Sequence, residues 1–314
     1  MKYLSLCLSF LFYASPTSSF ATAATSPSLL LSPSPTLSRP SVLFSGGDTT
    51  LAAPPPLLPP PAIYANAANA GASKLAGSPS KIFNLAVSSG IQISLGCFLV
   101  LGVGAACPEL ARSNPGLQKL MMGAFGLPLG LLMTLVTGGE LVTGNFVLGT
   151  IAVREKKATL SQLMKSWGVS YLGNLVGSLL LASMVYHSRA LSPISSASAV
   201  AIATAKTSAP FAATFLKATL CSYLVGIAVY MASGASSLAS KAVAVWFPIS
   251  AFVALGLEHC VANMFLVPLG MAFGAEVSVG TFLLKNLLPV TLGNAFGGAG
   301  MVALAFGGAY GRKD

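Results

Sequence analysis

The chain has 314 residues, of which 54% are hydrophobic and only 8% are charged, and its formal net charge is +10. This composition leaves too little polar surface to cover a soluble domain of that length, so it predicts a protein embedded in a lipid bilayer. The excess of Lys and Arg does not indicate nucleic-acid binding, because the basic residues are scattered and form no stripe with aromatic residues. The five cysteines have neither CxxC nor His-paired spacing, so no metal or other cofactor is expected.

Residues 1–80 have the composition of a targeting presequence followed by a linker. They hold three basic residues and one acid among abundant Ser, Thr, Pro and Ala. Lys2 and the apolar run at 3–13 are typical of a signal peptide, and the acid-poor Ser/Pro-rich stretch behind them is typical of a transit peptide. The arrangement resembles the bipartite presequences of plastids acquired by secondary endosymbiosis, with Phe20 at the cleavage point. A plain secretory signal and a simple chloroplast transit peptide are the alternatives.

Residues 81–314 are predicted to form one all-α bundle of six transmembrane helices. A hydrocarbon core of roughly 30 Å requires about 20 apolar residues per helix, and runs of this kind recur along the segment. The predicted spans are 82–106, 116–153, 160–186, 209–232, 242–273 and 282–309. The second and fifth exceed the length of one helix, and a polar, glycine-containing segment interrupts each. Paired interruptions of this kind indicate broken helices with a substrate site between them.

The two interruptions are related by an internal duplication. Residues 138–146 read GGELVTGNF and residues 256–264 read GLEHCVANM, so that Glu140 corresponds to Glu258. Each is followed by a lysine that precedes an asparagine by nine residues, in KSWGVSYLGN and KNLLPVTLGN. Three spans per repeat is an odd number, so the two halves insert in opposite orientations and form an inverted 3+3 repeat.

Four ionisable residues near the interruptions are the candidates for function. Glu140 and Glu258 would each cost several kcal/mol in a span unless paired, so we expect them to accept orphaned backbone N–H groups or to pair with a lysine. His259 lies beside Glu258, where an imidazole can donate a hydrogen bond or a proton to a passing anion. Lys206 precedes the fourth span, where a cation raises the local concentration of anions.

The motif GLEHCVANMF, together with GGELVTGN and the two LGN triplets, resembles the formate/nitrite transporter family over nearly all of residues 81–309. The resemblance implies an aquaporin-like bundle, a homopentamer and one pore per protomer. It makes His259 the pore histidine, Thr143 the hydroxyl that faces it, and Lys206 a vestibule lysine paired toward Glu258. The expected pathway residues are His259, Thr143, Lys206, Ser222, Glu258, Glu140, Asn145 and Asn263. The expected constriction residues are Leu127, Leu131, Leu141, Val142, Val225 and Phe252.

Three of these positions depart from the family pattern, which leaves pore width and selectivity open. Leu127 and Val142 stand where bacterial members often carry Phe, and Ser222 stands where they often carry Asn.

The expected function is transport of a small monovalent weak-acid anion, not catalysis. The anion, attracted by Lys206, would gain a proton from His259 or from water reached through it, and would cross as the neutral acid. A plastid envelope favours nitrite import; formate, lactate or hydrosulfide transport in another membrane, such as the plasma membrane, is the alternative. The expected partners are the anion, protons, membrane lipid and further copies of the chain. An intramembrane enzyme using Glu258, His259 and Cys260, or a non-transporting scaffold, is the rival from another class.

Overall fold

The computed structural model describes residues 57–124 and 126–312, and almost all of them are helical. Most of the predicted presequence, including Lys2 and Phe20, lies outside the described residues. The described residues belong to one compact unit.

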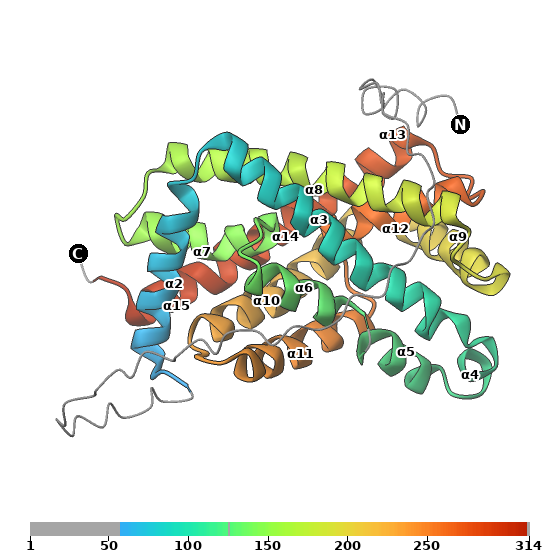
Figure 1. Cartoon of the computed structure of the whole chain (residues 1–314), viewed down its shortest axis with the longest axis horizontal. Helices are drawn as coiled ribbons and strands as arrows, with labels where there is room; N and C mark the ends of the chain where they lie inside the picture. The colour runs from blue at the N-terminus through green and yellow to red at the C-terminus, as the bar shows by residue number, and fades with distance from the viewer. Residues whose placement is uncertain (1–56, 125, 313–314) are drawn as a thin grey trace, which may run out of the picture. The chain divides into compact units, whose positions relative to one another are not determined.

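The first half contains the predicted broken helix (Figure 1). Its elements are α2 (Pro60–Leu75), α3 (Pro79–Gly102), η1 (Gly104–Ala106), α4 (Pro108–Ser113), α5 (Pro115–Ala124), α6 (Leu127–Val136), α7 (Val142–Arg154) and α8 (Leu160–Ser188). The break between α6 and α7 turns at Gly138, whose φ of 75° is readily adopted only by glycine.

The second half repeats this order. Its elements are α9 (Pro193–Ser208), α10 (Phe211–Ser233), α11 (Leu238–Ala254), α12 (Cys260–Ala272), α13 (Val279–Thr281), η2 (Phe282–Leu287), α14 (Leu288–Ala295), η3 (Phe296–Ala303) and α15 (Leu304–Tyr310). The second break, between α11 and α12, turns at Gly256 with a φ of 66°. Residues 279–310 run as one continuous span in which η2 and η3 are π-helical.

Five helical segments of the described part are long and apolar enough to cross a membrane, namely 79–106, 115–136, 160–188, 211–233 and 279–310. The fifth predicted span consists instead of the shorter apolar helices α11 and α12. Both breaks therefore lie inside the two spans that the sequence predicted to be broken.

Helix α2 lies inside the segment that the sequence assigned to a linker. Its side chains at Ile63, Tyr64 and Ala67 are buried. At Gly71 the helix lies so close to α7 that a Cβ atom would come within 1.9 Å of the Leu148 carbonyl oxygen. The folded part therefore begins before the predicted boundary at residue 80. Because α2 is short and alanine-rich and follows a proline run, its sequence has neither the length nor the hydropathy of a span.

Helix α9 is the counterpart of α2 in the second half. It packs against α12 as α2 packs against α7, and both precede the first long span of their half (Figure 1). Helix α3 pairs with α8, and α10 pairs with α14. Each half thus begins with a short helix, α2 or α9, that the sequence analysis did not name.

Candidate functional site

The LGN asparagine of the first half holds the first break in place. Asn174 of α8 accepts a hydrogen bond from the Val142 N–H at 3.0 Å through Oδ1. Its Nδ2 donates to the carbonyl oxygens of Glu140 at 3.0 Å and of Ala86 in α3 at 2.8 Å. One buried side chain therefore satisfies the backbone groups that the broken helix leaves without partners.

Asn294 of α14 does the same at the second break. Its Oδ1 accepts from the Cys260 N–H at 2.9 Å, and its Nδ2 donates to the carbonyl oxygens of Glu258 at 3.0 Å and Ala218 at 2.8 Å. The preceding Gly293 makes this reach possible, because a Cβ there would come within 2.4 Å of a backbone oxygen of α10. In this LGN triplet the glycine allows two helices to pack closely, and the asparagine amide makes hydrogen bonds to the backbone of the break.

The predicted pair of Lys206 and Glu258 is present. Lys206 Nζ lies 3.0 Å from Glu258 Oε2, and the Glu258 side chain is only 7% exposed. Asn263 Nδ2 donates to the same oxygen at 2.6 Å, and Asn286 in η2 connects Asn263 to the carbonyl oxygen of Lys206. The buried charge is therefore both ion-paired and hydrogen-bonded.

Glu140 has an equivalent partner that sequence reasoning missed. Lys74, near the end of α2, places Nζ 3.2 Å from Glu140 Oε1 and 2.7 Å from the Gly139 carbonyl oxygen. Asn145 Nδ2 donates to the other carboxylate oxygen at 2.8 Å. A signal was present in the sequence: Lys74 lies five residues before Pro79 and Lys206 four residues before Pro210, and each proline stands at the start of a span.

His259 is the N-cap residue of α12 and faces Thr143 across the two breaks. Its Nδ1 accepts from the Ala262 N–H at 3.1 Å, and its Nε2 lies 3.0 Å from Thr143 Oγ1. Because Nδ1 acts as an acceptor, the ring proton lies on Nε2 and is donated to the Thr143 hydroxyl. In an imidazolium Nδ1 would also carry a proton, and two N–H groups would then point at each other at the Ala262 contact. This geometry therefore favours the neutral ring.

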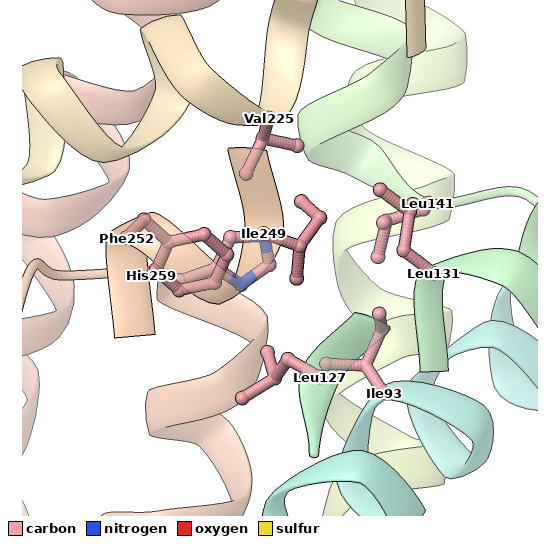
Figure 2. Close-up of a pocket in the computed structure, with 8 residues that line it drawn as sticks. All are labelled: Ile93, Leu127, Leu131, Leu141, Val225, Ile249, Phe252 and His259. Atoms are coloured by element: carbon pink, nitrogen blue, oxygen red, sulfur yellow. The ribbon is translucent and has the colours of Figure 1, made fainter. Parts of the chain in front are cut away.

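A small cavity lies at the His259 imidazole, between the two breaks (Figure 2). Its lining residues are Ile93, Leu127, Leu131, Leu141, Val225, Ile249, Phe252 and His259. Apart from His259 this lining is wholly apolar, and the Phe252 ring stacks on the imidazole with centroids 5.8 Å apart. Five of the expected constriction residues line this cavity, together with Ile93 and Ile249, which the sequence analysis did not name.

Val142 and Ser222, also named from the sequence, lie elsewhere. Val142 is buried but lines a different groove, on the outer side of α7. Ser222 lies one turn before Val225 in α10 and packs against Gly297, and its hydroxyl has no hydrogen-bond partner within the described part of the chain.

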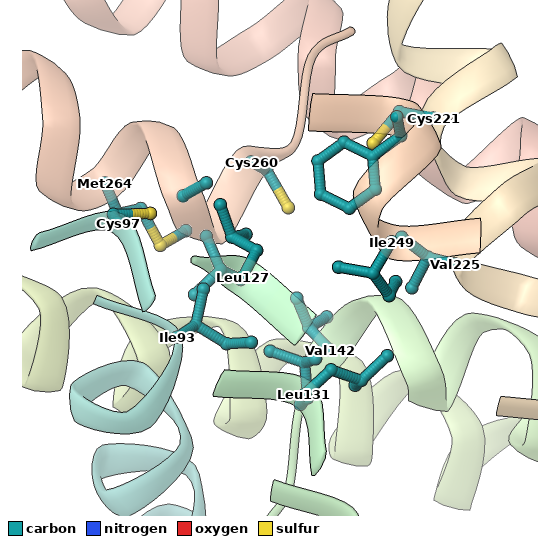
Figure 3. Close-up of a cluster of buried hydrophobic side chains, with 14 of the residues drawn as sticks. Ile93, Cys97, Leu127, Leu131, Val142, Cys221, Val225, Ile249, Cys260 and Met264 are labelled. Carbon is teal, nitrogen blue, oxygen red and sulfur yellow. The ribbon is translucent and has the colours of Figure 1, made fainter. Parts of the chain in front are cut away.

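The cysteines of the described part are free thiols, and Cys97, Cys221 and Cys260 lie buried among apolar side chains (Figure 3). The described residues contain no group of three or more His, Cys, Asp or Glu placed to hold a metal ion. Both ring nitrogens of His259 are already bonded, to Ala262 and Thr143, so neither is available as a base for the Cys260 thiol.

Comparison with known proteins points to one family. The formate/nitrite transporter family model matches residues 61–307. A probable formate transporter of Methanothermobacter thermautotrophicus is 35% identical over 72% of this chain and 87% of that protein. The nitrite transporter NirC of Escherichia coli is 34% identical over 69% of this chain and 79% of its own length. The structure of a pentameric formate channel with formate bound covers 74% of this chain and 98% of its own, with 31% identity and a TM-score of 0.66.

These matches confirm the predicted fold class, and the relatives are transporters and channels rather than enzymes. The chain therefore belongs to the formate/nitrite transporter family of multi-pass membrane proteins.

Proposed function

We propose that the protein conducts a small monovalent weak-acid anion, with nitrite as its substrate, and that the substrate passes the central cavity as the neutral acid. The observation that carries this proposal is the cavity itself, in which a neutral imidazole bonded to Thr143 is the sole polar group. A bare anion there would meet no counter-charge and would cost several kcal/mol. A weak acid avoids this cost by taking up a proton, whereas nitrate and chloride cannot.

The charges around the cavity support entry as an anion. Lys74 and Lys206 each lie beside a carboxylate at one of the two breaks, and inverted repeats place such pairs on opposite sides of the cavity. The N-termini of α7 and α12 begin at the breaks and favour negative charge. An anion drawn inward by these groups loses solvation, and its affinity for a proton rises.

Water supplies the proton in this scheme, and His259 supplies a hydrogen bond. The neutral ring carries one N–H proton, on Nε2. Losing this proton would leave an imidazolate unless Nδ1 first released its hydrogen bond from the Ala262 N–H and took up a proton of its own. Thr143 does not line the central cavity, but because it accepts from Nε2, its own hydroxyl proton is free to be donated to a substrate oxygen that approaches the contact between His259 and Thr143. His259 and Thr143 then act together as one donor to the substrate.

We further propose that the protein is a homopentamer in a plastid envelope and imports nitrite there. The solved pentameric channel supports the assembly, and the composition of residues 1–80 supports the location. Formate transport, or transport of lactate or hydrosulfide, in another membrane such as the plasma membrane is the alternative. The relatives include both formate transporters and a nitrite transporter, so family membership is compatible with either substrate.

Uptake into proteoliposomes tests the transport proposal. The purified chain should carry nitrite and formate at rates that rise as the external pH falls, while nitrate and chloride stay at the rate of protein-free vesicles. Equal rates for weak-acid and strong-acid anions would contradict passage as the neutral acid. A complete absence of weak-acid flux would refute the transporter proposal and favour the scaffold.

Imaging tests the location separately. The full chain with a fluorescent protein at its C-terminus should label the plastid envelope of an algal host, and the same chain without residues 1–56 should not. Labelling of the plasma membrane by the full chain would favour the alternative.

A further inference from the structure

A second hollow lies on the outer side of α7, α8 and α14, away from the central cavity. Its walls include Val142, Phe146, Trp167, Tyr171, Thr291 and Leu292, and its empty space is about 850 Å3 including the open side. None of its lining residues lines the central cavity. We call it the lateral groove.

The lateral groove offers no free hydrogen-bond donor to a polar ligand, since Thr291 Oγ1 donates to the Leu287 carbonyl oxygen and the other two donors are also bonded. Tyr171 and Thr291 lie 3.1 Å apart, hydroxyl to hydroxyl, and Trp167 Nε1 donates to the Asn145 carbonyl oxygen at 3.2 Å. These are its polar side chains, and no charged residue of the described chain lines it. An occupant must therefore be apolar, since a polar one would lose its hydrogen bonds to water without replacing them.

The lateral groove lies at the depth of the helix breaks. Tyr171 precedes Asn174 by one helical turn and Thr291 precedes Asn294 by one turn, and those two asparagines brace the breaks. In an inverted repeat the breaks lie near the middle of the bilayer, where the surrounding solvent is hydrocarbon. Leu172 and Leu292 at the groove are 57% and 48% exposed, so hydrocarbon can reach it from the side.

We propose that the lateral groove binds one acyl chain of a bilayer lipid. The chain would lie against Phe146 and Trp167, whose rings meet edge to face with centroids 4.8 Å apart. Trp167 is in turn bonded to the backbone of Asn145, which holds Glu140. A filled groove would thus support the first break from outside. This site is independent of which anion crosses the central cavity.

Tryptophan quenching by brominated lipid tests the proposal on the full chain. The sequence contains two tryptophans, so Trp246→Phe leaves Trp167 as the reporter. In phosphatidylcholine vesicles, bromines at mid-chain should quench its emission about twofold more than bromines near the headgroup, because the groove lies at mid-depth. The matched variant Trp167→Phe reports on Trp246 of α11 and controls for general lipid contact.

A groove-filling substitution separates a bound chain from passing lipid. A Cβ at Gly168 meets no atom within 4 Å, so Gly168→Leu in the Trp246→Phe background projects into open space and should displace the chain. Quenching of Trp167 by mid-chain bromines should then fall about twofold. Gly308→Leu in α15 is the control, because its surroundings are equally open and it lies outside the groove.

Two results would overturn the proposal. Mid-chain quenching that is unchanged by Gly168→Leu would show that no chain occupies the groove. Absent quenching of Trp167, together with disulfide cross-linking between copies through Leu172→Cys, would show that a second copy of the protein covers it. Neither result depends on transport, so the proposal can fail while the proposed function stands.

Discussion

The two helix breaks share one scaffold and differ where they face each other. Both contain a glycine with positive φ, a buried glutamate paired with a lysine, and an asparagine from a later span that braces the break. Aligning residues 138–146 with 256–264 pairs Leu141 with His259 and Thr143 with Val261. At these two unlike positions, His259 of one break and Thr143 of the other make a polar contact with each other. The residues that the two repeats share hold the breaks in place, and the residues that differ are the ones available to contact substrate.

The central cavity follows the same rule. Ile93 and Val225 each lie seven residues after an alanine that accepts from the bracing asparagine, and Leu131 and Ile249 each lie nine residues before the paired glutamate. Two pairs of lining residues therefore come from equivalent positions of the two repeats and are apolar in both. His259, opposite Leu141, breaks this symmetry. The two repeats thus form a cavity that is apolar except for one hydrogen-bond donor, His259, which comes from the second repeat.

Loss of the shared scaffold should have the largest effect. Asn294→Leu leaves the Cys260 N–H and the carbonyl oxygens of Ala218 and Glu258 without partners, at about 1–3 kcal/mol for each buried group. We expect no stable folded protein, measured as loss of the monodisperse peak and of the thermal transition in detergent. Asn174→Leu should be equally damaging, and tolerance of either change would show that the two braces are not equivalent.

Removing the asymmetry should abolish most transport while the fold survives. His259→Leu makes the second break resemble the first, so the cavity loses its polar group and the Ala262 N–H loses its cap, at about 1 kcal/mol of stability. The uptake rate of nitrite or formate should fall about tenfold or more, because the substrate loses its hydrogen-bonding partner. His259→Asn can still cap the helix, so it should recover the stability but not the rate. Recovery of both would assign His259 to capping alone.

The sequence was sufficient to predict the breaks and the duplication, because these depend on hydropathy and on residues close together in the motifs. The pairing of Lys206 with Glu258, which lie 52 residues apart, was expected from the family resemblance alone. The sequence did not reveal α2, because a short helix that packs on the outside of a bundle lacks the hydropathy of a span. Lys74 was missed for the same reason, since its role depends on where α2 packs.

The cavity lining was predicted in part, and the reason is geometric. The family resemblance, carried over position by position, supplied the five lining residues that were expected: Leu127, Leu131, Leu141, Val225 and Phe252. Ile93 and Ile249 lie outside the two duplicated motifs, in helices where many apolar residues look alike in sequence. Val142 is adjacent to Leu141, but neighbouring residues of a helix point about 100° apart, and Val142 faces the lateral groove instead.

A smaller effect is expected at the other asymmetric position. Thr143→Val makes α7 match Val261 of α12 and removes the hydroxyl that accepts from His259. Loss of one such hydrogen bond is worth about 1 kcal/mol, so the uptake rate should fall about fivefold. Thr143→Ser keeps the hydroxyl and should retain most of the rate. If Thr143→Val transports as well as wild type, His259 donates to the substrate without it.

The smallest effect on uptake is expected from Lys74 and Lys206, and these lysines test most directly whether the two breaks are equivalent. Lys74→Met with Glu140→Gln, and Lys206→Met with Glu258→Gln, each remove one pair without leaving a buried charge behind, so stability should change little. Each double variant should slow uptake about threefold at low salt, and only when the anion is added from the side of the missing lysine. High salt should erase the difference, because the attraction is screened beyond about 10 Å.

Side-specific loss in both double variants would mean that the repeats provide two equivalent entrances to one asymmetric centre. If removing the Lys74 pair has no effect from either side, then α2 braces the first break without guiding substrate. The two repeats would then differ in function at the entrances of the pathway as well as at His259. Because the two variants share the same chemistry at equivalent positions, each serves as the matched control for the other.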